Sequence, residues 1–178
     1  HPNKFWHFLN EVLFDNWDFD ATTAALIGSE ILNSLSDIEF AELSRVFKVT
    51  LMRYAFESLS FYHEQKLNIV NIKINEQKTF AWLKINIDST RFPQIHLDLL
   101  LKRTFDNAWK AVDFRLKGIT YVNLKKHIYR HHFKELKLKG LLSKLEEKNK
   151  LYFKDLCKSE ANYIDPNRPP CLWNYDKK

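Results

Sequence analysis

Residues 109–140 are WKAVDFRLKGITYVNLKKHIYRHHFKELKLKG, and this stretch decides the fold because it passes from a last strand into a basic helix. The strand pattern ends at Gly118, one of only 3 glycines in the chain. Ile119 to Val122 leads directly into a helix that is expected to reach Phe133 and to close at Gly140. This order predicts where the sheet stops and where positive charge follows it.

Three segments upstream, residues 67–75, 79–88 and 93–102, alternate apolar and polar side chains in the same way as residues 110–116. This period of two is typical of strands that bury one face. The connecting segments are short enough for hairpins. The sequence therefore predicts a four-stranded twisted antiparallel meander with one aliphatic face.

Helical patterns precede and follow these strands. Helices are predicted over residues 3–16, 20–32, 36–62, 121–133 and 139–156. Asp20 is the expected cap of the second helix, and Ser36 with Glu39 forms a capping-box pattern for the third. The result is an α+β fold in which N- and C-terminal helices pack the sheet around an apolar pocket. Residues 1–156 are expected to form one domain, and residues 157–178 a C-terminal tail.

Composition excludes several classes of protein. The chain has 178 residues, of which 45% are hydrophobic and 15% aromatic, with only 3 Gly and 5 Pro. It is too apolar for a disordered protein and too poor in glycine for a loop-rich scaffold. No apolar run approaches the roughly 18 residues of a membrane span. A globular protein with a substantial core is expected.

Positive charge is concentrated in one segment. Residues 121–150 hold nine Lys or Arg and three Asp or Glu, a difference equal to the net charge of +6 of the whole chain. Lys126, Arg130, Lys134 and Lys137 are predicted to lie opposite the apolar stripe of this helix. They are candidates for docking to a partner or an anionic surface, and an ordinary solvated helix face is the alternative.

Catalytic and metal-binding signatures are scarce. The sequence has no glycine-rich phosphate loop, no GxSxG and no HExxH. His127 and His131 have the i, i+4 spacing of metal ligands, but a third ligand is not evident and neighbouring cations would repel a metal. His132 falls within the apolar stripe, where a hydrogen-bonded histidine is expected. Neither a metal site nor a cofactor is predicted.

Asp98 and Asp113 are the two carboxylates that could serve an enzyme as a base, because both lie on predicted strands. The alternation directs both away from the aliphatic face. A salt bridge to a cross-strand Lys or Arg is therefore the favoured interpretation for each.

Two cysteines, Cys157 and Cys171, stand at the start of the tail and inside it. A disulfide between them would hold the tail and would require an oxidising compartment, whereas two free buried thiols are the alternative. The chain begins with His1-Pro2 and lacks an initiating Met. Removal of a secretory leader is consistent with this start.

From Trp109 onward the sequence resembles the MlaC-like family, also known as toluene-tolerance or ABC-transporter auxiliary proteins. The matching positions are Trp109, Asp113, Gly118, Thr120, Phe133 and Gly140. The upstream helix, with Phe47, Tyr54 and Tyr62, is also similar, so the resemblance covers about residues 20–150. Thr120 stands where the family usually has Ser, and Lys125-Lys126 replaces the more typical Tyr-Arg.

The resemblance implies a function. Members of that family are periplasmic carriers of phospholipid that maintain the lipid asymmetry of the outer membrane. They exchange lipid with an outer-membrane lipoprotein–porin complex and with an inner-membrane ABC transporter bearing an MCE-domain protein. The resemblance thus implies a monomeric, non-enzymatic periplasmic protein with bound phospholipid as its ligand, no cofactor and no nucleic-acid partner.

The candidate lipid-binding residues come from the apolar faces of the strands and of the third helix. They are Phe47, Leu51, Tyr54, Val70, Ile72, Ile74, Leu83, Ile85, Ile87, Leu97, Leu99, Val112, Phe114 and Leu116. Lys125, at the edge of the apolar stripe, is expected to reach a headgroup phosphate. Two alternatives remain open: a small-molecule enzyme on a cone-shaped α+β fold that uses Asp98 or Asp113, and a basic module that binds a partner or nucleic acid.

Overall fold

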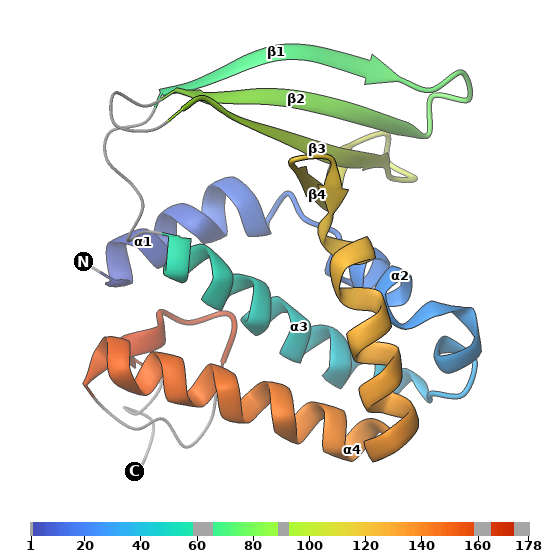
Figure 1. The fold of residues 1–178 in the computed structure, drawn as a ribbon, viewed down its shortest axis with the longest axis vertical. Coiled ribbons are helices and arrows are strands. Elements are labelled where there is room, and N and C mark those ends of the chain that lie inside the picture. The colour runs from blue at the N-terminus through green and yellow to red at the C-terminus, as the bar shows by residue number, and fades with distance from the viewer. Residues whose placement is uncertain (1, 59–65, 89–92, 159–164, 173–178) are drawn as a thin grey trace.

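A computed structural model describes residues 2–58, 66–88, 93–158 and 165–172 (Figure 1). The helical elements are α1 (Pro2–Leu9), the π-helical turn η1 (Asn10–Phe14), α2 (Phe19–Leu32), α3 (Asp37–Ser58), α4 (Tyr121–Cys157) and the 3-10 turn η3 (Pro170–Leu172). The strands are β1 (Lys66–Ile74), β2 (Phe80–Asp88), β3 (Ile95–Arg103), β4 (Trp109–Leu116) and β5 (Ile119–Thr120). Figure 1 shows the sheet arching over a layer of helices.

The strands pair in chain order, β1-β2-β3-β4-β5, and every pair is antiparallel. The predicted α+β class and the meander are confirmed, and the predicted count of four strands is too low by the short β5. Lys117 and Gly118 both have positive φ, 49° and 82°, which is the geometry of a two-residue hairpin turn. Gly118 therefore lets β4 turn back into β5 and on into α4.

The helix starts agree with the sequence patterns in one case and differ in another. The capping box forms before α3, where the Ser36 amide donates to Glu39 at 2.9 Å and the Glu39 amide donates to Ser36 Oγ at 3.3 Å. The predicted Asp20 cap of α2 is wrong. Asp18 caps α2 by accepting from the Ala21 amide at 2.9 Å, and Asp20 instead accepts from the hydroxyl of Ser44 on α3.

Two of the helices are broken inside their span. Gly28 interrupts α2 with φ 80° and ψ 166°, and Lys137 interrupts α4 with φ 57° and ψ −175°. The break in α4 thus falls at Lys137, before the predicted closure at Gly140, which lies in the helix. A Cβ at position 140 would approach Leu136 Cβ to 2.5 Å, so glycine is required there by packing.

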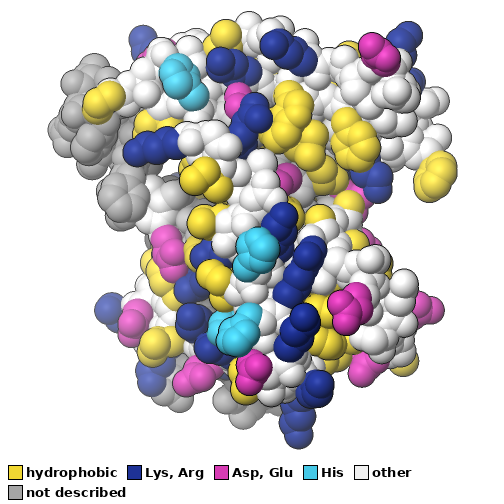
Figure 2. Space-filling view, turned by 45° about the vertical axis from the view of Figure 1, so that its right-hand side comes forward, with side chains coloured by type: hydrophobic (Ala, Val, Ile, Leu, Met, Phe, Trp, Pro, Cys, Tyr) yellow, Lys and Arg dark blue, Asp and Glu magenta, His cyan; other side chains and the backbone are white. Residues whose placement is uncertain are grey.

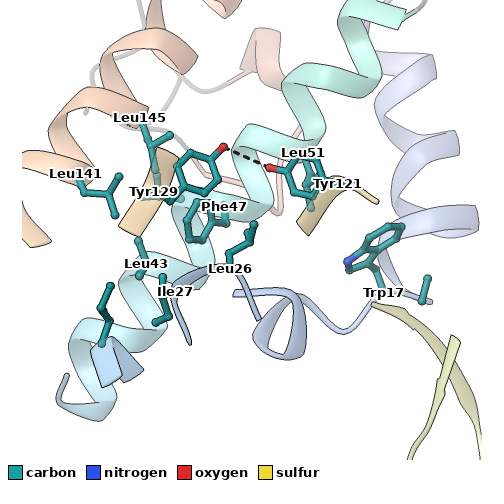
Figure 3. Packing of buried hydrophobic residues seen from close by; sticks show 13 residues of the cluster. Trp17, Leu26, Ile27, Leu43, Phe47, Leu51, Tyr121, Tyr129, Leu141 and Leu145 are labelled. Carbon is teal, nitrogen blue, oxygen red and sulfur yellow. Dashed lines mark hydrogen bonds between the residues drawn. The ribbon is translucent and has the colours of Figure 1, made fainter. Parts of the chain in front are cut away.

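Most buried hydrophobic residues form one core between α2, α3 and α4 (Figure 3). Phe47 and Tyr129 pack with ring centroids 4.9 Å apart, and the Tyr121 and Tyr129 hydroxyls lie 3.4 Å apart. A second cluster joins α1 and η1 to α3 and the last part of α4. The helices therefore hold together without the outer strands of the sheet.

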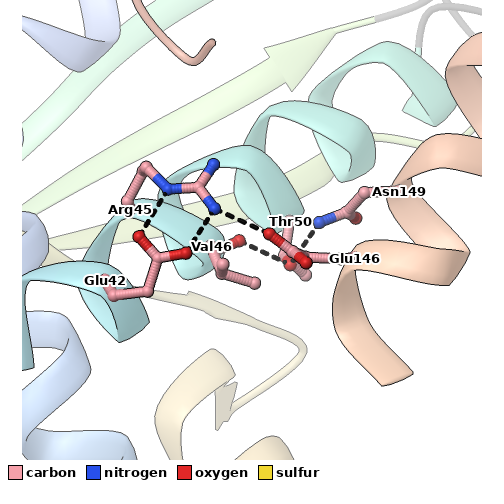
Figure 4. Close-up of polar contacts among 6 residues, drawn as sticks. All are labelled: Glu42, Arg45, Val46, Thr50, Glu146 and Asn149. Carbon is pink, nitrogen blue, oxygen red and sulfur yellow. Dashed lines mark hydrogen bonds and ion pairs between the residues drawn. The ribbon is translucent and has the colours of Figure 1, made fainter. Parts of the chain in front are cut away.

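Polar contacts join α3 to the second half of α4 (Figure 4). Arg45 binds Glu42 at 2.7 Å on its own helix and Glu146 at 2.6 Å across the interface. Buried Asn149 donates to Thr50 Oγ1 at 3.1 Å. These contacts fix the second half of α4 against α3.

The described part of the tail lies near both α1 and α4. A disulfide joins Cys157, at the end of α4, to Cys171. Lys48 on α3 donates to Asn167 Oδ1 at 3.0 Å. In the described ranges, no helix combines the length and the apolar character that crossing a membrane requires.

Candidate functional site

The sheet turns one aliphatic face towards the helices, and we call it the inner face. Ala111 belongs to the main core, and Leu101 and Phe114 pack against it. The strand register aligns these positions with side chains of the outer strands: Phe114 pairs with Leu99, Leu99 with Leu83, and Leu83 with Ile72. Since paired residues point to the same side of a sheet, the inner face extends across all four long strands.

Among the described residues, helices cover the inner face mainly on its β4 side. Helices α2 and α4 meet the sheet at β4, whereas β1 packs mainly on β2. Leu67, Ile69, Val70, Ile72 and Ile74 on β1 keep 51 to 70% of their surface exposed, and Ile95 and Leu116 keep 43 and 41%. Large exposed aliphatic surfaces of this kind are uncommon on monomeric proteins and are typical of binding sites.

Two β-bulges change which side chains lie on the inner face, compared with the prediction from the sequence. The β1–β2 register shifts between Ile69 and Asn71, so Val70 is the extra residue and has no partner in the ladder. The shift aligns Leu67 and Ile69 with Ile87 and Ile85, and strict alternation from Val70 had missed both. The β3–β4 register shifts in the same way and leaves Val112 unpaired and buried. The adjacent apolar pairs Ile69-Val70 and Ala111-Val112 were the available sequence signal.

Of the three candidate lipid-binding residues on α3, two lie in the core and one lies between the core and the inner face of the sheet. Phe47 and Leu51 lie in the main core with 1 and 8% exposure, so they support the site from beneath. Tyr54 is half-buried, with its ring centroid 6.1 Å from that of Tyr121, which in turn stacks on Phe114 at 5.3 Å. Tyr54 therefore lies between the inner face of the sheet and the core that α3 and α4 share.

Two cations lie beside Tyr54. Lys125 Nζ is 5.3 Å from the centroid of the Tyr54 ring, and the guanidinium carbon of Arg53 is 4.7 Å from it. Arg53 pairs with Glu57 at 3.4 Å and keeps a buried Nε without a hydrogen-bond acceptor. Burial raises the pKa of Tyr121 and Tyr129, so both hydroxyls stay neutral at physiological pH. Both charged groups that contact the Tyr54 ring are cations. The sequence patterns predicted Lys125 but missed Arg53.

Neither candidate base lies on the inner face of the sheet. Asp98 lies on the outer face, paired with cross-strand Arg115 at 2.7 Å as predicted, in a shallow polar depression that Asn71 and Trp82 also line. The salt bridge predicted for Asp113 is wrong. Asp113 is buried and accepts hydrogen bonds from the Phe114 and Val122 amides at 2.8 and 3.2 Å.

Asp113 has a structural role at the junction of β4 and α4. Burial raises the pKa of its carboxyl, while hydrogen bonds from the backbone of Val122, Phe114 and Tyr121 and from the Thr120 side chain oppose that rise. Thr120 also accepts from the Asn123 amide at 3.1 Å and caps α4. The Asp113, Gly118 and Thr120 positions of the resemblance thus build the strand-to-helix turn.

His127, His131 and His132 lie close together in the sequence of α4. His127 and His131 are exposed, and within the described ranges no three His, Cys, Asp or Glu side chains come together in a way that could hold an ion. His132 accepts a hydrogen bond from Lys144 Nζ at 2.9 Å. This contact links the two halves of α4 across the break at Lys137.

The basic face of α4 is present but is not uniform (Figure 2). Figure 2 shows Lys and Arg side chains in a row with histidines below a group of hydrophobic side chains. Lys134 and Lys137 are exposed and Lys126 is half-buried. Arg130 donates to the Leu26 and Ala25 carbonyls at 3.1 Å each, so its guanidinium binds α2 instead of pointing freely into solvent as the predicted docking role requires.

The chain is similar to a known protein family and, in its fold, to a solved structure. The family model described as MlaC protein matches residues 1–147. The fold is similar to that of the phospholipid-binding protein from Ralstonia solanacearum, solved in complex with a phospholipid, with a TM-score of 0.74 and 17% sequence identity over 85% of this chain and 84% of that one. No significant match to a curated protein was found.

Proposed function

This chain belongs to the MlaC family, and from that premise we propose that it is a carrier that binds a phospholipid on the inner face of its sheet. The observation that carries the proposal is the exposed aliphatic surface of β1, which faces the helical side of the molecule. The similar protein from Ralstonia solanacearum was solved with a phospholipid, which supports the same ligand class.

The chemistry of such a site requires no catalytic group. Each CH₂ removed from water contributes about 0.8 kcal/mol, so an acyl chain of about 16 carbons would gain on the order of 10 kcal/mol. A lipid that moves from a bilayer to the inner face exchanges one apolar environment for another. Uptake and release are therefore close to balanced in free energy, as a reversible carrier needs.

The proposed acyl-binding surface consists of the exposed and half-exposed side chains of the inner face. They include Leu67, Ile69, Ile72, Ile74, Leu83, Ile85, Ile87, Ile95, Leu97, Leu99, Phe114 and Leu116. Val70 and Val112 border this surface at the bulges. Lys125, beside Tyr54, is proposed to attract the headgroup phosphate.

The wider role follows from the family. We propose a periplasmic monomer that carries lipid between an outer-membrane lipoprotein–porin complex and an inner-membrane ABC transporter with an MCE-domain protein. Lys126, Lys134 and Lys137 are the proposed docking cations of α4. The disulfide between Cys157 and Cys171 is consistent with an oxidising compartment.

Native mass spectrometry of the purified protein, followed by organic extraction, tests the proposal. A diacyl phospholipid is expected in the wild type and should be lost in Ile72→Asn. Because Ile72 is already 54% exposed, its replacement costs the fold little. Lys73→Asn, on the outer face of the same strand, is the matched control and should retain the lipid. A folded wild type that carries no lipid and takes none from vesicles would overturn the carrier function.

A further inference from the structure

One end of the sheet gathers cations that lie far apart in the sequence. The meander brings the β1–β2 turn and the β3–β4 turn to the same end, where the Arg103 amide donates to the Thr79 carbonyl at 2.8 Å. The register places Phe80, Lys102 and Lys110 in one row across three strands. We call residues 73–84 and 102–110 the sheet-end patch.

The sheet-end patch is the second concentration of positive charge in the molecule. Its 21 residues hold six Lys or Arg and two Asp or Glu, a net charge of +4. Lys102 approaches Asp18 at 3.8 Å, whereas Lys73, Lys78 and Arg103 are exposed. Counting charge along the chain misses this patch because the two hairpins join segments that are about 20 residues apart.

The most exposed aromatic side chain of the described residues stands in the centre of the β3–β4 turn. The Phe105 side chain is fully exposed, and that of Phe80 is 41% exposed. The turn is closed by hydrogen bonds from the Thr104 amide to the Ala108 carbonyl at 2.8 Å and from the Asn107 amide to the Thr104 carbonyl at 3.0 Å. The hydrogen-bonded turn thus keeps the Phe105 ring exposed to water, so the protein does not gain the free energy that burying this ring would give.

We propose that the sheet-end patch docks on the surface of an anionic phospholipid bilayer. Lys and Arg side chains near such a surface are attracted to its phosphates, and an aromatic ring at a projecting tip enters the interface between headgroups and acyl chains. The cations are spread over two turns and three strands instead of converging on one point. That distribution suits a surface with many anions better than a single acidic site on a protein.

The lysines and Phe80 of the patch lie off the inner face of the sheet, to which its Ile74 and Leu83 belong, and they are separate from the basic face of α4. Phe80, Lys102 and Lys110 alternate with inner-face positions along their strands, so they lie on the outer side of the sheet. The proposal therefore does not rest on lipid being carried inside the protein. Variants of the patch should lose vesicle binding while they keep any lipid that co-purifies.

Co-sedimentation with vesicles provides the test. The wild type should bind vesicles of phosphatidylcholine that contain phosphatidylglycerol, should bind pure phosphatidylcholine vesicles much less, and should be released by added salt. Each Lys near an anionic surface contributes about fivefold in affinity, so Lys73→Gln with Lys78→Gln should weaken binding by about 25-fold. Phe105→Ser should weaken it by at least about tenfold, because the ring no longer leaves water.

Matched controls distinguish the patch from other surfaces. Lys139→Gln with Lys150→Gln removes two exposed cations from α4 that are not among its proposed docking cations, and Ile38→Ser removes an exposed apolar side chain at the start of α3. Both controls should bind as the wild type does. A spin label at Phe105→Cys should become inaccessible to an aqueous quencher on vesicles, whereas one at Ile38→Cys should not.

Three results would each overturn the proposal. The wild type could fail to bind anionic vesicles, which would assign the patch to a protein partner. The α4 pair could weaken binding as much as the patch pair does. The label at position 105 could stay in water while the protein is bound.

Discussion

Arg130→Met is expected to destabilise the fold by about 3 kcal/mol, although Arg130 lies on the basic face of α4. Gly28 breaks α2 with φ 80°, and a break of this kind leaves carbonyls of the preceding turn short of helical donors. Arg130 Nη2 and Nε donate to the Ala25 and Leu26 carbonyls at 3.1 Å each. A hydrogen bond to a charged donor contributes about 1.5 to 3 kcal/mol, and the lower value suits these partly exposed bonds.

Urea unfolding followed by circular dichroism measures this loss. With an m-value of about 2 kcal/mol per M, the midpoint should fall by about 1.5 M. Lys134→Met is the matched control, because it removes a cation from an exposed position one turn later on the same helix. Its effect should stay within about 0.5 kcal/mol. Arg130→Lys should lie between the two, because one ammonium group cannot reproduce the forked geometry of the guanidinium.

A second substitution isolates the role of Gly28. Its φ and ψ belong to a region that is essentially restricted to glycine, so Gly28→Ala should cost about 1 to 3 kcal/mol. A Cβ there would also approach Arg130 Nη2 to 2.8 Å. Gly28→Ala should therefore cost less in the Arg130→Met background than in the wild type. Strict additivity, or an Arg130→Met variant as stable as Lys134→Met, would refute the idea that Arg130 caps the broken helix.

Three further predictions concern other parts of the fold. Asp113→Ala should destabilise the protein by about 2 kcal/mol in urea, because the Phe114 amide on β4 and the Val122 amide at the start of α4 lose their acceptor. Burial, followed by the charge of Lys144, lowers the pKa of His132 in the folded protein. The unfolded chain therefore binds a proton more readily, and the free energy of unfolding should fall as the pH drops below about 6.5. His132→Gln should flatten this pH dependence when unfolding is measured at several pH values. Replacing Cys157 and Cys171 with Ser should cost about 3 kcal/mol in thermal unfolding, since the disulfide closes a short loop, and an unchanged midpoint would show that the tail is held by other contacts.

Patterns in the sequence predicted the strands, and the start of α3, well because these features depend on residues that are close together in the chain. The period of two identified β1 to β4 within two residues at each end, and Ser36 with Glu39 marked the start of α3. The resemblance from Trp109 onward indicated the family that the comparison then showed. These features depend on neighbours in the chain, so a single sequence contains the information that determines them.

The candidate site was predicted less completely, because it depends on strand register. One extra residue in β1 brought Leu67 and Ile69 onto the inner face and left Val70 outside the ladder. Periodicity also cannot distinguish a filled core from an open surface. Phe47 and Ile72 fit equally good apolar patterns, yet Phe47 is 1% exposed and Ile72 54% exposed.

The sequence by itself thus determined which segments form strands and helices, that each of them has an apolar face, and where the last strand passes into α4. Only the tertiary structure decided which of those apolar faces meet. Helices α2 and α4 cover the sheet at β4 and leave β1 open, and the hairpins join cations that the chain separates. The physical reason is that periodicity is set by backbone geometry within one element, whereas burial and charge clustering depend on which other elements lie alongside it.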